Sequence, residues 1–519
     1  MSYRNTLTWL IILGILARCI IASSIEFGND EVYYWTYSQH LQWNYFDHPP
    51  MVAVLIRLTT FNLSLQQFEL FVRLGSIICS AFASYFLYAA VSNVSNEKAA
   101  LLSALLYNAS FYGSIITGVF ILPDSPQMFF WTASLFALSK LITSKKSVTI
   151  HWLLFGLLTG LTIMSKIHGL FIWTGLMLYV ILYRRNWLSL PQLYLSMLVC
   201  LLVIAPFFVW NLQNNFITYR FHSSRLGGIK FKGDNFLREI FGEIFYNNPV
   251  NVVVTFMALS WFLKNPGNVK NDFLKVSTLI SIPMILILLV LAMFNDTLPH
   301  WTGPAYITLL PLAAIYLSQG TENIVKIPRI VRFSLAFTSF VAIGGVLLIN
   351  FFPGTLGNQK TTSKFGEGDV TLDMYGWREA AKKIDSLIVN DKKSGAMPAN
   401  FQFVSNKWYP AAHIDYYIAR PLNKFVIGIG EMNDLHHYVW LNESRLKKST
   451  LRDAYCVFPS DYTCNVKELY ADKFKSIDSV GAFPIYRSNR VSKYFFGLAP
   501  TTQCDSIQPT PRILINTRR

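Results

Sequence analysis

Apolar segments of about 20 residues recur along the chain from the N-terminus to about residue 352. A helix of about 20 apolar residues spans the hydrocarbon core of a bilayer, so this pattern predicts a polytopic α-helical membrane protein. The composition agrees, because 52% of the 519 residues are hydrophobic and only 14% are charged, whereas soluble domains are about a quarter charged. We expect eleven spans, at 6–25, 69–92, 99–118, 125–143, 151–166, 169–184, 192–210, 249–264, 274–294, 300–318 and 330–352.

Basic residues predict the orientation of these spans. If the N-terminus lies inside, 13 of the 22 Lys and Arg residues before residue 356 fall in the connections on the inner side. This agrees with the enrichment of Lys and Arg in the cytoplasmic loops of membrane proteins. An odd number of spans then places the C-terminus outside. The net charge of +16 is explained by this topology, and no groove-reading motif indicates a nucleic-acid partner.

The chain changes character after residue 352. Residues 353–519 are polar, and the short apolar runs FQFVSN, KFVIGIG and AYCVFPS alternate with helical patterns such as MYGWREAAKKIDSLI. We therefore expect a transmembrane domain over 1–352 and an extracytoplasmic α/β domain over 353–519. Outer loop 26–68 would carry juxtamembrane helices. Outer loop 211–248 contains an amphipathic helix and is either a mobile interfacial loop or a plain linker.

Two local features leave alternatives open. Cys456 and Cys464 form a disulfide if they lie in an oxidising compartment, or they are thiols on a strand and a turn. The first apolar segment lacks a small-residue cleavage site, so we expect it to be a span and not a signal peptide.

With this topology, ionisable residues from distant segments fall on the outer side of the membrane. These residues are Asp30, Glu31 and Asp47 in the first outer loop, Arg73 in the second span, Asp124 after the third, Lys166 and His168 after the fifth, and His300 at the tenth. Ionisable groups at membrane depth are costly, so such a cluster indicates a functional site. Each residue also has a structural explanation, since acids cap helices and long basic side chains reach lipid headgroups.

Several motifs resemble those of a known family. The stretches GNDEVYYWTYSQHLQWNYFDHPPMVA, VRLGS, LPDSPQMFFW, SKIHGLF and LPHWTGPAYITLLPLAA occur in this order, followed by YGWREAAKKI, WYPAAHIDYYIAR and HHYVW. They resemble the bacterial branch of the protein O-mannosyltransferase-like superfamily, which includes the lipid A aminoarabinose transferase and the lipopolysaccharide galacturonosyltransferases. The resemblance covers most of the chain.

The resemblance implies a GT-C fold and a membrane glycosyltransferase. Such an enzyme, a hexosyl- or pentosyltransferase, takes a sugar from a polyprenyl phosphate on the periplasmic face of the bacterial inner membrane. The acceptor would be lipid A, another envelope glycan or a protein, and membrane lipids would surround the enzyme.

The resemblance also implies roles for individual residues. Asp30 matches the first-loop acid that activates the acceptor, and Asp47 matches the second acid, which orients the acceptor or binds a metal. Glu31 and Asp124 would support them. The candidates for the donor phosphate are Arg73, Lys166, His168 and His48, and those for the substrate pocket are Tyr33, Tyr34, His300 and Trp301. His48 departs from the pattern, because the aminoarabinose transferase has a lysine there.

The expected chemistry is consistent with these residue types. An acceptor hydroxyl needs a base, which a partly desolvated carboxylate supplies, and the departing phosphate needs fixed cations or a metal. With Asp30 as the base, a single displacement inverts the anomeric carbon. No cofactor is certain, although Asp47, His48 and His300 offer ligand types that suit Zn²⁺ or Mn²⁺.

Two other classes of protein remain as alternatives. A transporter or flippase of a lipid-linked glycan also has many spans and charged residues at depth, but we find no inverted repeat. A lipopolysaccharide ligase or polymerase would place its basic residues in a large central outer loop, such as 211–248. The acidic first loop favours the glycosyltransferase.

Overall fold

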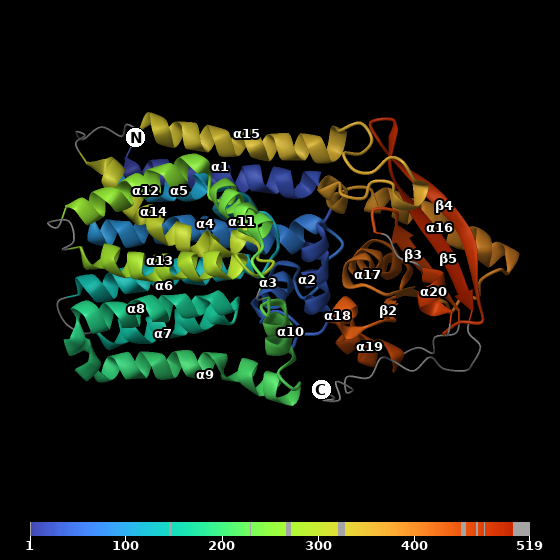
Figure 1. Ribbon diagram of the computed structural model, residues 1–519, viewed down its shortest axis with the longest axis horizontal. Coiled ribbons are helices and arrows are strands. Elements are labelled where there is room, and N and C mark those ends of the chain that lie inside the picture. The colour runs from blue at the N-terminus through green and yellow to red at the C-terminus, as the bar shows by residue number, and fades with distance from the viewer. Residues whose placement is uncertain are drawn as a thin grey trace. The chain divides into compact units, whose positions relative to one another are not determined.

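The computed structural model describes the chain apart from residues 1, 145–147, 229, 266–270, 320–326, 448–452, 463–465, 472 and 502–519. The chain divides into two compact units (Figure 1). The first unit comprises Met1–Ala22 and Leu41–Ile343, and the second comprises Ser23–His40 and Gly344–Arg519.

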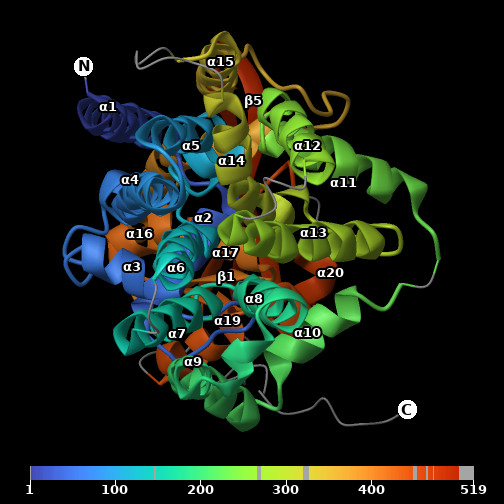
Figure 2. The same ribbon diagram turned by 90° about the vertical axis from the view of Figure 1, so that its left-hand side faces the viewer.

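The first unit is a bundle of helices that run side by side and are seen nearly end-on in Figure 2. Its elements are α1 (Tyr3–Ser24), α3 (Met51–Thr59), α4 (Glu69–Val94), α5 (Glu97–Ala109), η1 (Tyr112–Ile116), α6 (Asp124–Thr143), α7 (Thr149–Ile163), η2 (Ile167–Gly169), α8 (Leu170–Tyr183), η3 (Arg185–Ser189), α9 (Pro191–Gln213), α10 (Ile217–Arg225), α11 (Gly233–Tyr246), α12 (Pro249–Lys264), α13 (Asp272–Ala292), η5 (Pro299–Thr302), α14 (Gly303–Ser318) and α15 (Arg329–Phe351), whose last turns belong to the second unit.

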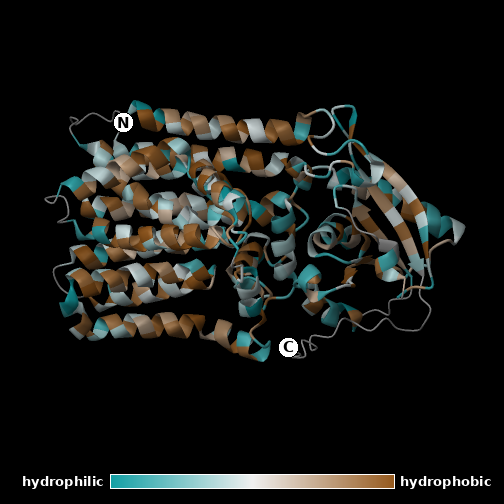
Figure 3. Ribbon diagram, viewed as in Figure 1, coloured by the Kyte–Doolittle hydropathy of each residue, from teal (hydrophilic) through white to brown (hydrophobic). Residues whose placement is uncertain are grey.

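These helices confirm the mostly helical membrane architecture. Each of the eleven predicted spans falls on a helical segment, and the helices of the bundle carry mostly hydrophobic residues (Figure 3). Among the described residues, five helices are long and apolar enough to cross a membrane, namely α1, α4, α9, α13 and α15. The protein is therefore a multi-pass membrane protein.

The third predicted span, 99–118, is not one continuous helix. Helix α5 ends at Ala109, Ser110 is extended with φ −79° and ψ 129°, and the chain continues as the π-helix η1. The buried guanidinium of Arg18 lies at this interruption, where it donates to Ser114 O at 2.9 Å and to Asn108 Oδ1 at 2.8 Å. A partner of this kind is needed because a carbonyl released from a helix inside a membrane has no water to accept from.

The second unit contains a five-stranded sheet in the order β2-β1-β3-β5-β4. Strand β1 is parallel to β2 and β3, whereas β5 is antiparallel to β3 and β4. The elements are α2 (Asn29–Gln39), η6 (Thr362–Lys364), η7 (Val370–Met374), α16 (Trp377–Ser394), β1 (Gln402–Ser405), α17 (Trp408–Ile414), η8 (Asp415–Ala419), η9 (Arg420–Leu422), β2 (Val426–Gly428), α18 (Met432–Leu435), α19 (Tyr438–Leu446), β3 (Ala454–Pro459), α20 (Val466–Tyr470), β4 (Ser476–Arg487) and β5 (Arg490–Thr501).

Sequence patterns found part of this sheet. The three predicted strands correspond to β1, β2 and β3, and the predicted helix corresponds to α16. The hairpin β4–β5 was missed, because apolar and polar residues do not alternate cleanly along β4. Its turn residues Ser488 and Asn489 both have positive φ, at 47° and 64°. A two-residue hairpin turn of type I′ requires positive φ at both positions. The proposed Cys456–Cys464 disulfide involves Cys464, which lies outside the described residues.

Helix α2 of the first outer loop packs within the second unit. Its buried Trp35 meets Tyr416 edge to face, with ring centroids 5.0 Å apart, and Tyr33 lies at the same centroid distance from Trp408. An isolated helix of 11 residues is marginal in water. These aromatic contacts with the C-terminal segment therefore stabilise α2.

A fully buried ion pair ties the second unit together, and we expect its loss to be costly. Arg487 lies 3.0 Å from Asp369, with both side chains 0% exposed, and also donates to Gly354 O at 2.9 Å. Arg487→Met leaves a buried carboxylate without its cation, which costs about 3–5 kcal/mol. Hydrogen–deuterium exchange on the full-length protein should show faster exchange in β4 and β5.

Arg490→Met is the matched control, because Arg490 is exposed at the start of β5. It should leave the exchange of both strands unchanged. Unaltered protection in Arg487→Met would contradict a stabilising role for the pair.

Candidate active site

A buried ion pair in the first unit joins Lys166 to Asp124. Asp124 begins α6, and Lys166 lies in the turn between α7 and η2. The ammonium Nζ lies 2.9 and 2.8 Å from the two carboxylate oxygens, and each side chain is only 4% exposed. The positive charge of Lys166 is therefore already neutralised by Asp124.

Tyr112 completes the coordination of this carboxylate. Its hydroxyl donates to Asp124 Oδ1 at 3.0 Å, and its side chain is fully buried in η1. The ring packs against Gly303 at the start of α14, where a Cβ atom would come within 2.4 Å of it. A glycine at this position is thus required for the Tyr112 ring to reach Asp124.

Three histidines lie in the electrostatic field of this ion pair. His48, His168 and His300 come from three different segments, and each interacts with both Asp124 and Lys166. Burial lowers the pKa of His48 to about 3 and the pKa of His168 well below its usual value, so both imidazoles are neutral at pH 7. The His168 Nδ1 atom is buried and has no hydrogen-bond partner among the described residues.

Aromatic rings border these histidines. The ring of His168 lies 5.8 Å from that of Trp301, and the ring of His300 lies 6.0 Å from that of Tyr246. The structure thus places His300 and Trp301, two predicted pocket residues, beside the histidine and aromatic side chains of the first unit.

Asp47 lies next to His48 in a loop that α10 holds. It is 9% exposed, and its backbone oxygen lies 2.8 Å from His222 Nε2 on α10. One turn earlier, the Thr218 hydroxyl donates to Tyr45 O at 3.0 Å. These contacts fix the backbone around Asp47 and His48 against the loop 211–248.

The predicted residues are distributed over both units. Asp30, Glu31, Tyr33 and Tyr34 lie on α2 in the second unit, whereas the remaining predicted residues lie in the first. Asp30 is exposed and the other three are buried. The Glu31 carboxylate accepts from the Gly28 amide at 3.1 Å, a capping contact that stabilises the start of α2.

Arg73 is fully buried in α4 and donates from Nη1 to Ala22 O at 2.7 Å. This contact ties α4 to the end of α1. The carbonyl of Ala22 lies in the last turn of α1, where helical carbonyls lack intrahelical partners.

The proposed metal ligands do not form a binding set. Across the described part of the chain, no three side chains of His, Cys, Asp or Glu are grouped so that they could hold a metal ion. This includes Asp47, His48 and His300. We therefore derive no step through a metal.

Helix α11 presents an unexpected inner face. It is amphipathic, as predicted for loop 211–248, with Leu237, Phe241 and Phe245 exposed. The opposite face carries the buried carboxylates of Glu239 and Glu243. The Oε1 atoms of both carboxylates have no hydrogen-bond partner among the described residues.

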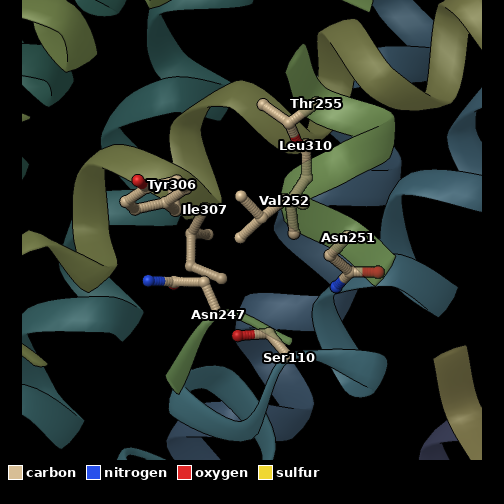
Figure 4. A pocket seen from close by; sticks show the side chains of 8 residues that line it. All are labelled: Ser110, Asn247, Asn251, Val252, Thr255, Tyr306, Ile307 and Leu310. Carbon is tan, nitrogen blue, oxygen red and sulfur yellow. The ribbon is translucent and has the colours of Figure 1, made fainter. Parts of the chain in front are cut away.

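Hydroxyl groups satisfy the other oxygens of these carboxylates. Thr297 donates to Glu239 at 2.7 Å, and Tyr306 donates to Glu243 at 3.1 Å. Tyr306 also lines the small pocket drawn in Figure 4. The pocket is lined by Ser110, Asn247, Asn251, Val252, Thr255, Tyr306, Ile307 and Leu310, none of which was predicted as a site residue.

Sequence reasoning missed Tyr112, His222 and Glu243. Tyr112 and His222 act on Asp124 and Asp47 through contacts that no local motif predicts. Glu243 had a weak signal, because it is four residues after Glu239 on an amphipathic helix. Acidic residues at this spacing share a helix face, but the pattern does not say that this face is the buried one.

Comparisons with known proteins show which sequences and folds this chain resembles. Residues 47–210 match the family model described as dolichyl-phosphate-mannose-protein mannosyltransferase. The chain is 28% identical over 431 residues to the lipid A galacturonosyltransferase RgtD of Rhizobium johnstonii, which covers 80% of this chain and 85% of the relative. The crystal structure of ArnT from Cupriavidus metallidurans bound to undecaprenyl phosphate matches with a TM-score of 0.64 and 11% identity, over 96% of this chain and 98% of ArnT.

The chain is similar to membrane glycosyltransferases and has the fold of ArnT. The structure of the same ArnT in the apo state also matches, with a TM-score of 0.59 and 12% identity over 96% of this chain and 98% of ArnT. Both comparisons with ArnT show the fold, and the similarity to RgtD extends through most of both chains.

We expect the Lys166–Asp124 pair to be essential for the stability of the first unit. Lys166→Met leaves Asp124 buried without a cation, at a cost of about 3–5 kcal/mol. The double variant Asp124→Asn, Lys166→Met should recover part of the loss, since neither charge is then buried. The measurement is the apparent Tm of the purified protein in detergent.

Lys140→Met, a half-buried lysine in the last turn of α6, serves as the control. A Tm of Lys166→Met equal to that of the wild type would contradict the role of the pair.

Stability of the first unit should also depend on pH through Glu243, which lies outside the expected spans. Burial, and then the neighbouring Glu239, raise the pKa of Glu243 to about 8 from 4.5. Between these values the folded state holds the proton and the unfolded state does not, so stability falls as pH rises from about 4.5 to about 8. Glu243→Gln should flatten this slope in thermal unfolding across pH.

The exposed Asp234 in the first turn of α11 offers a matched substitution, Asp234→Asn. It should keep the wild-type slope. If Glu243→Gln keeps that slope too, the buried carboxylate is not the source of the pH dependence.

Proposed function

We propose that this enzyme transfers a sugar from a polyprenyl phosphate to a lipid A-type glycolipid. The observation that carries the proposal is the similarity to RgtD, named as a lipid A galacturonosyltransferase, over most of both chains. The fold shared with ArnT, which was crystallised with undecaprenyl phosphate, supports a polyprenyl-phosphate donor. Galacturonic acid is the first sugar to test.

The proposed setting is the bacterial inner membrane. Eleven spans over 1–352 would place the chemistry and the domain over 353–519 on the periplasmic side. The distribution of Lys and Arg among the loops supports this orientation.

The proposed reaction is a single displacement at the anomeric carbon. The carboxylate of Asp30 takes the proton of the acceptor hydroxyl, and the oxygen forms a bond to the anomeric carbon. The bond from that carbon to the donor phosphate breaks, and polyprenyl phosphate leaves with the electron pair. Asp47 orients the acceptor in this scheme. Both assignments rest on the motif of the first outer loop.

Basic residues of the first unit stabilise the negative charge of the leaving phosphate in this proposal. Lys166 is the main candidate, with His48 and His168 as neutral imidazoles that donate hydrogen bonds. Because Asp124 already holds Lys166, a bound phosphate would share the ammonium with that carboxylate. Arg73 is a further candidate from α4.

The remaining predicted residues have supporting roles in this proposal. Tyr33, Tyr34, His300 and Trp301 would contact the sugar, since aromatic faces suit the apolar side of a pyranose. Glu31 would act through the start of α2, where its carboxylate caps the helix.

The proposal predicts that Asp30→Asn abolishes transfer while donor binding persists. General-base catalysis contributes about 10²–10⁴-fold, so turnover should fall by at least about 100-fold. The assay uses the protein reconstituted in liposomes, polyprenyl-phosphate galacturonic acid, other polyprenyl-phosphate sugars, and lipid A, with mass spectrometry of the glycolipid. Asp434→Asn is the control, because Asp434 is exposed in the same unit.

Three results would contradict the proposal. Full activity of Asp30→Asn would remove the base assignment. Transfer only to a protein or another glycan would remove lipid A as the acceptor. Movement of the donor across the bilayer without sugar release would favour the flippase alternative.

A further inference from the structure

Asn29 is the first residue of helix α2, and Asp30 is the second. We propose that His413 is a positioning residue, which holds Asn29 and thereby sets the orientation of the Asp30 carboxylate. This inference rests on the proposed function, because it assumes that Asp30 is the base.

The Asn29 side chain is held from two sides. His413 Nε2 lies 3.0 Å from Asn29 Oδ1. Because an amide oxygen only accepts, the proton of the imidazole lies on Nε2. The carboxylate of Asp373 also interacts with the Asn29 side chain, and because a carboxylate only accepts, this interaction favours the amide nitrogen on the side of Asp373. Both neighbours therefore favour the same orientation of the amide.

His413 is itself immobilised at the end of α17. Its ring is 0% exposed and stacks on the indole of Trp377, with centroids 4.0 Å apart and planes within 2° of parallel. Burial lowers its pKa well below the usual value, so the ring is neutral at pH 7. The bond to Asn29 is the one hydrogen bond that the His413 ring forms among the described residues, since Nδ1 has no partner there.

The chain just before α2 is attached to the same elements. Glu26 accepts from the amides of Trp377 at 2.7 Å and Arg378 at 3.1 Å, at the N-terminus of α16. Phe27 donates its amide to the Tyr417 hydroxyl at 2.9 Å. The start of α2 is therefore fixed by the C-terminal segment at residues 26, 27 and 29.

This arrangement has a consequence for catalysis. A catalytic group displaced by about 1 Å can cost about 100-fold in rate, and α2 is too short to hold its position alone. The hydrogen bond from His413 acts on the residue directly before Asp30, and a single substitution can remove it. Its loss should lower turnover more than substrate affinity.

Three variants of the full-length protein test the inference. His413→Phe keeps an aromatic ring on Trp377 and removes the Nε2 proton. His413→Gln restores an N–H donor toward Asn29, and His151→Phe in the first unit is a matched control on α7. Each is assayed for sugar transfer and for hydrogen–deuterium exchange of residues 28–39.

For His413→Phe we expect faster exchange at the start of α2, a fall in kcat of about tenfold or more, and a KM for the donor within about twofold of the wild type. His413→Gln should recover most of both the exchange protection and kcat. His151→Phe should match the wild type in all three measurements.

Two results would overturn the positioning role. One is faster exchange in His413→Phe with an unchanged kcat, and the other is a lower kcat with unchanged exchange. Asp30→Asn runs in the same assay. Its full activity would refute the base assignment even if α2 were anchored as described, so failure of the proposed function is distinguished from failure of this inference.

Discussion

The arrangement of His48, His168 and His300 in the first unit depends on the buried ion pair between Lys166 and Asp124. A single unpaired charge at this depth would be strongly destabilising, so the start of α6 and the turn after α7 are fixed relative to each other. Tyr112 adds a third segment through its hydrogen bond to Asp124. The histidines near this pair therefore lie beside a cation and an anion whose charges sum to zero.

This neutrality matters for the proposed reaction. A free cation would already bind the singly charged phosphate of the donor tightly, and the part of this binding that is equal in the donor complex and the transition state lowers KM without raising kcat. A lysine shared with Asp124 offers less to the donor, whose phosphate carries a single negative charge. It offers more to the polyprenyl phosphate monoester, whose charge grows as the glycosidic bond breaks.

The second unit depends on a different constraint, the stability of a short helix. Helix α2 has 11 residues, and its first turn is polar because it consists of Asn29, Asp30 and Glu31, so neither its length nor a continuous apolar face stabilises it alone. Its aromatic side chains contact α17, η8 and His436, and its N-terminus is held through Glu26, Asn29 and His413. The acidic motif of the first outer loop is thus supported by residues almost 400 positions further along the chain.

Hydropathy predicted the helical segments of the first unit because lipid exposure imposes a length and a composition on each helix. It could not predict the interruption at Ser110, which Arg18 stabilises from α1. The charge pattern brought Asp124 and Lys166 to one side of the membrane, but not into contact. Tyr112, His222 and His413 were missed, because each acts through a partner more than ten residues away that no spacing rule identifies.

The stereochemistry of transfer is the most direct test of a single displacement by an oxygen that Asp30 deprotonates. The donor would be a polyprenyl-phosphate sugar of known anomeric configuration, and the glycolipid product would be examined by nuclear magnetic resonance of its anomeric proton. The account predicts inversion at the anomeric carbon. Retention would require a covalent glycosyl-enzyme or an equivalent second displacement, and it would contradict Asp30 as a base in a one-step reaction.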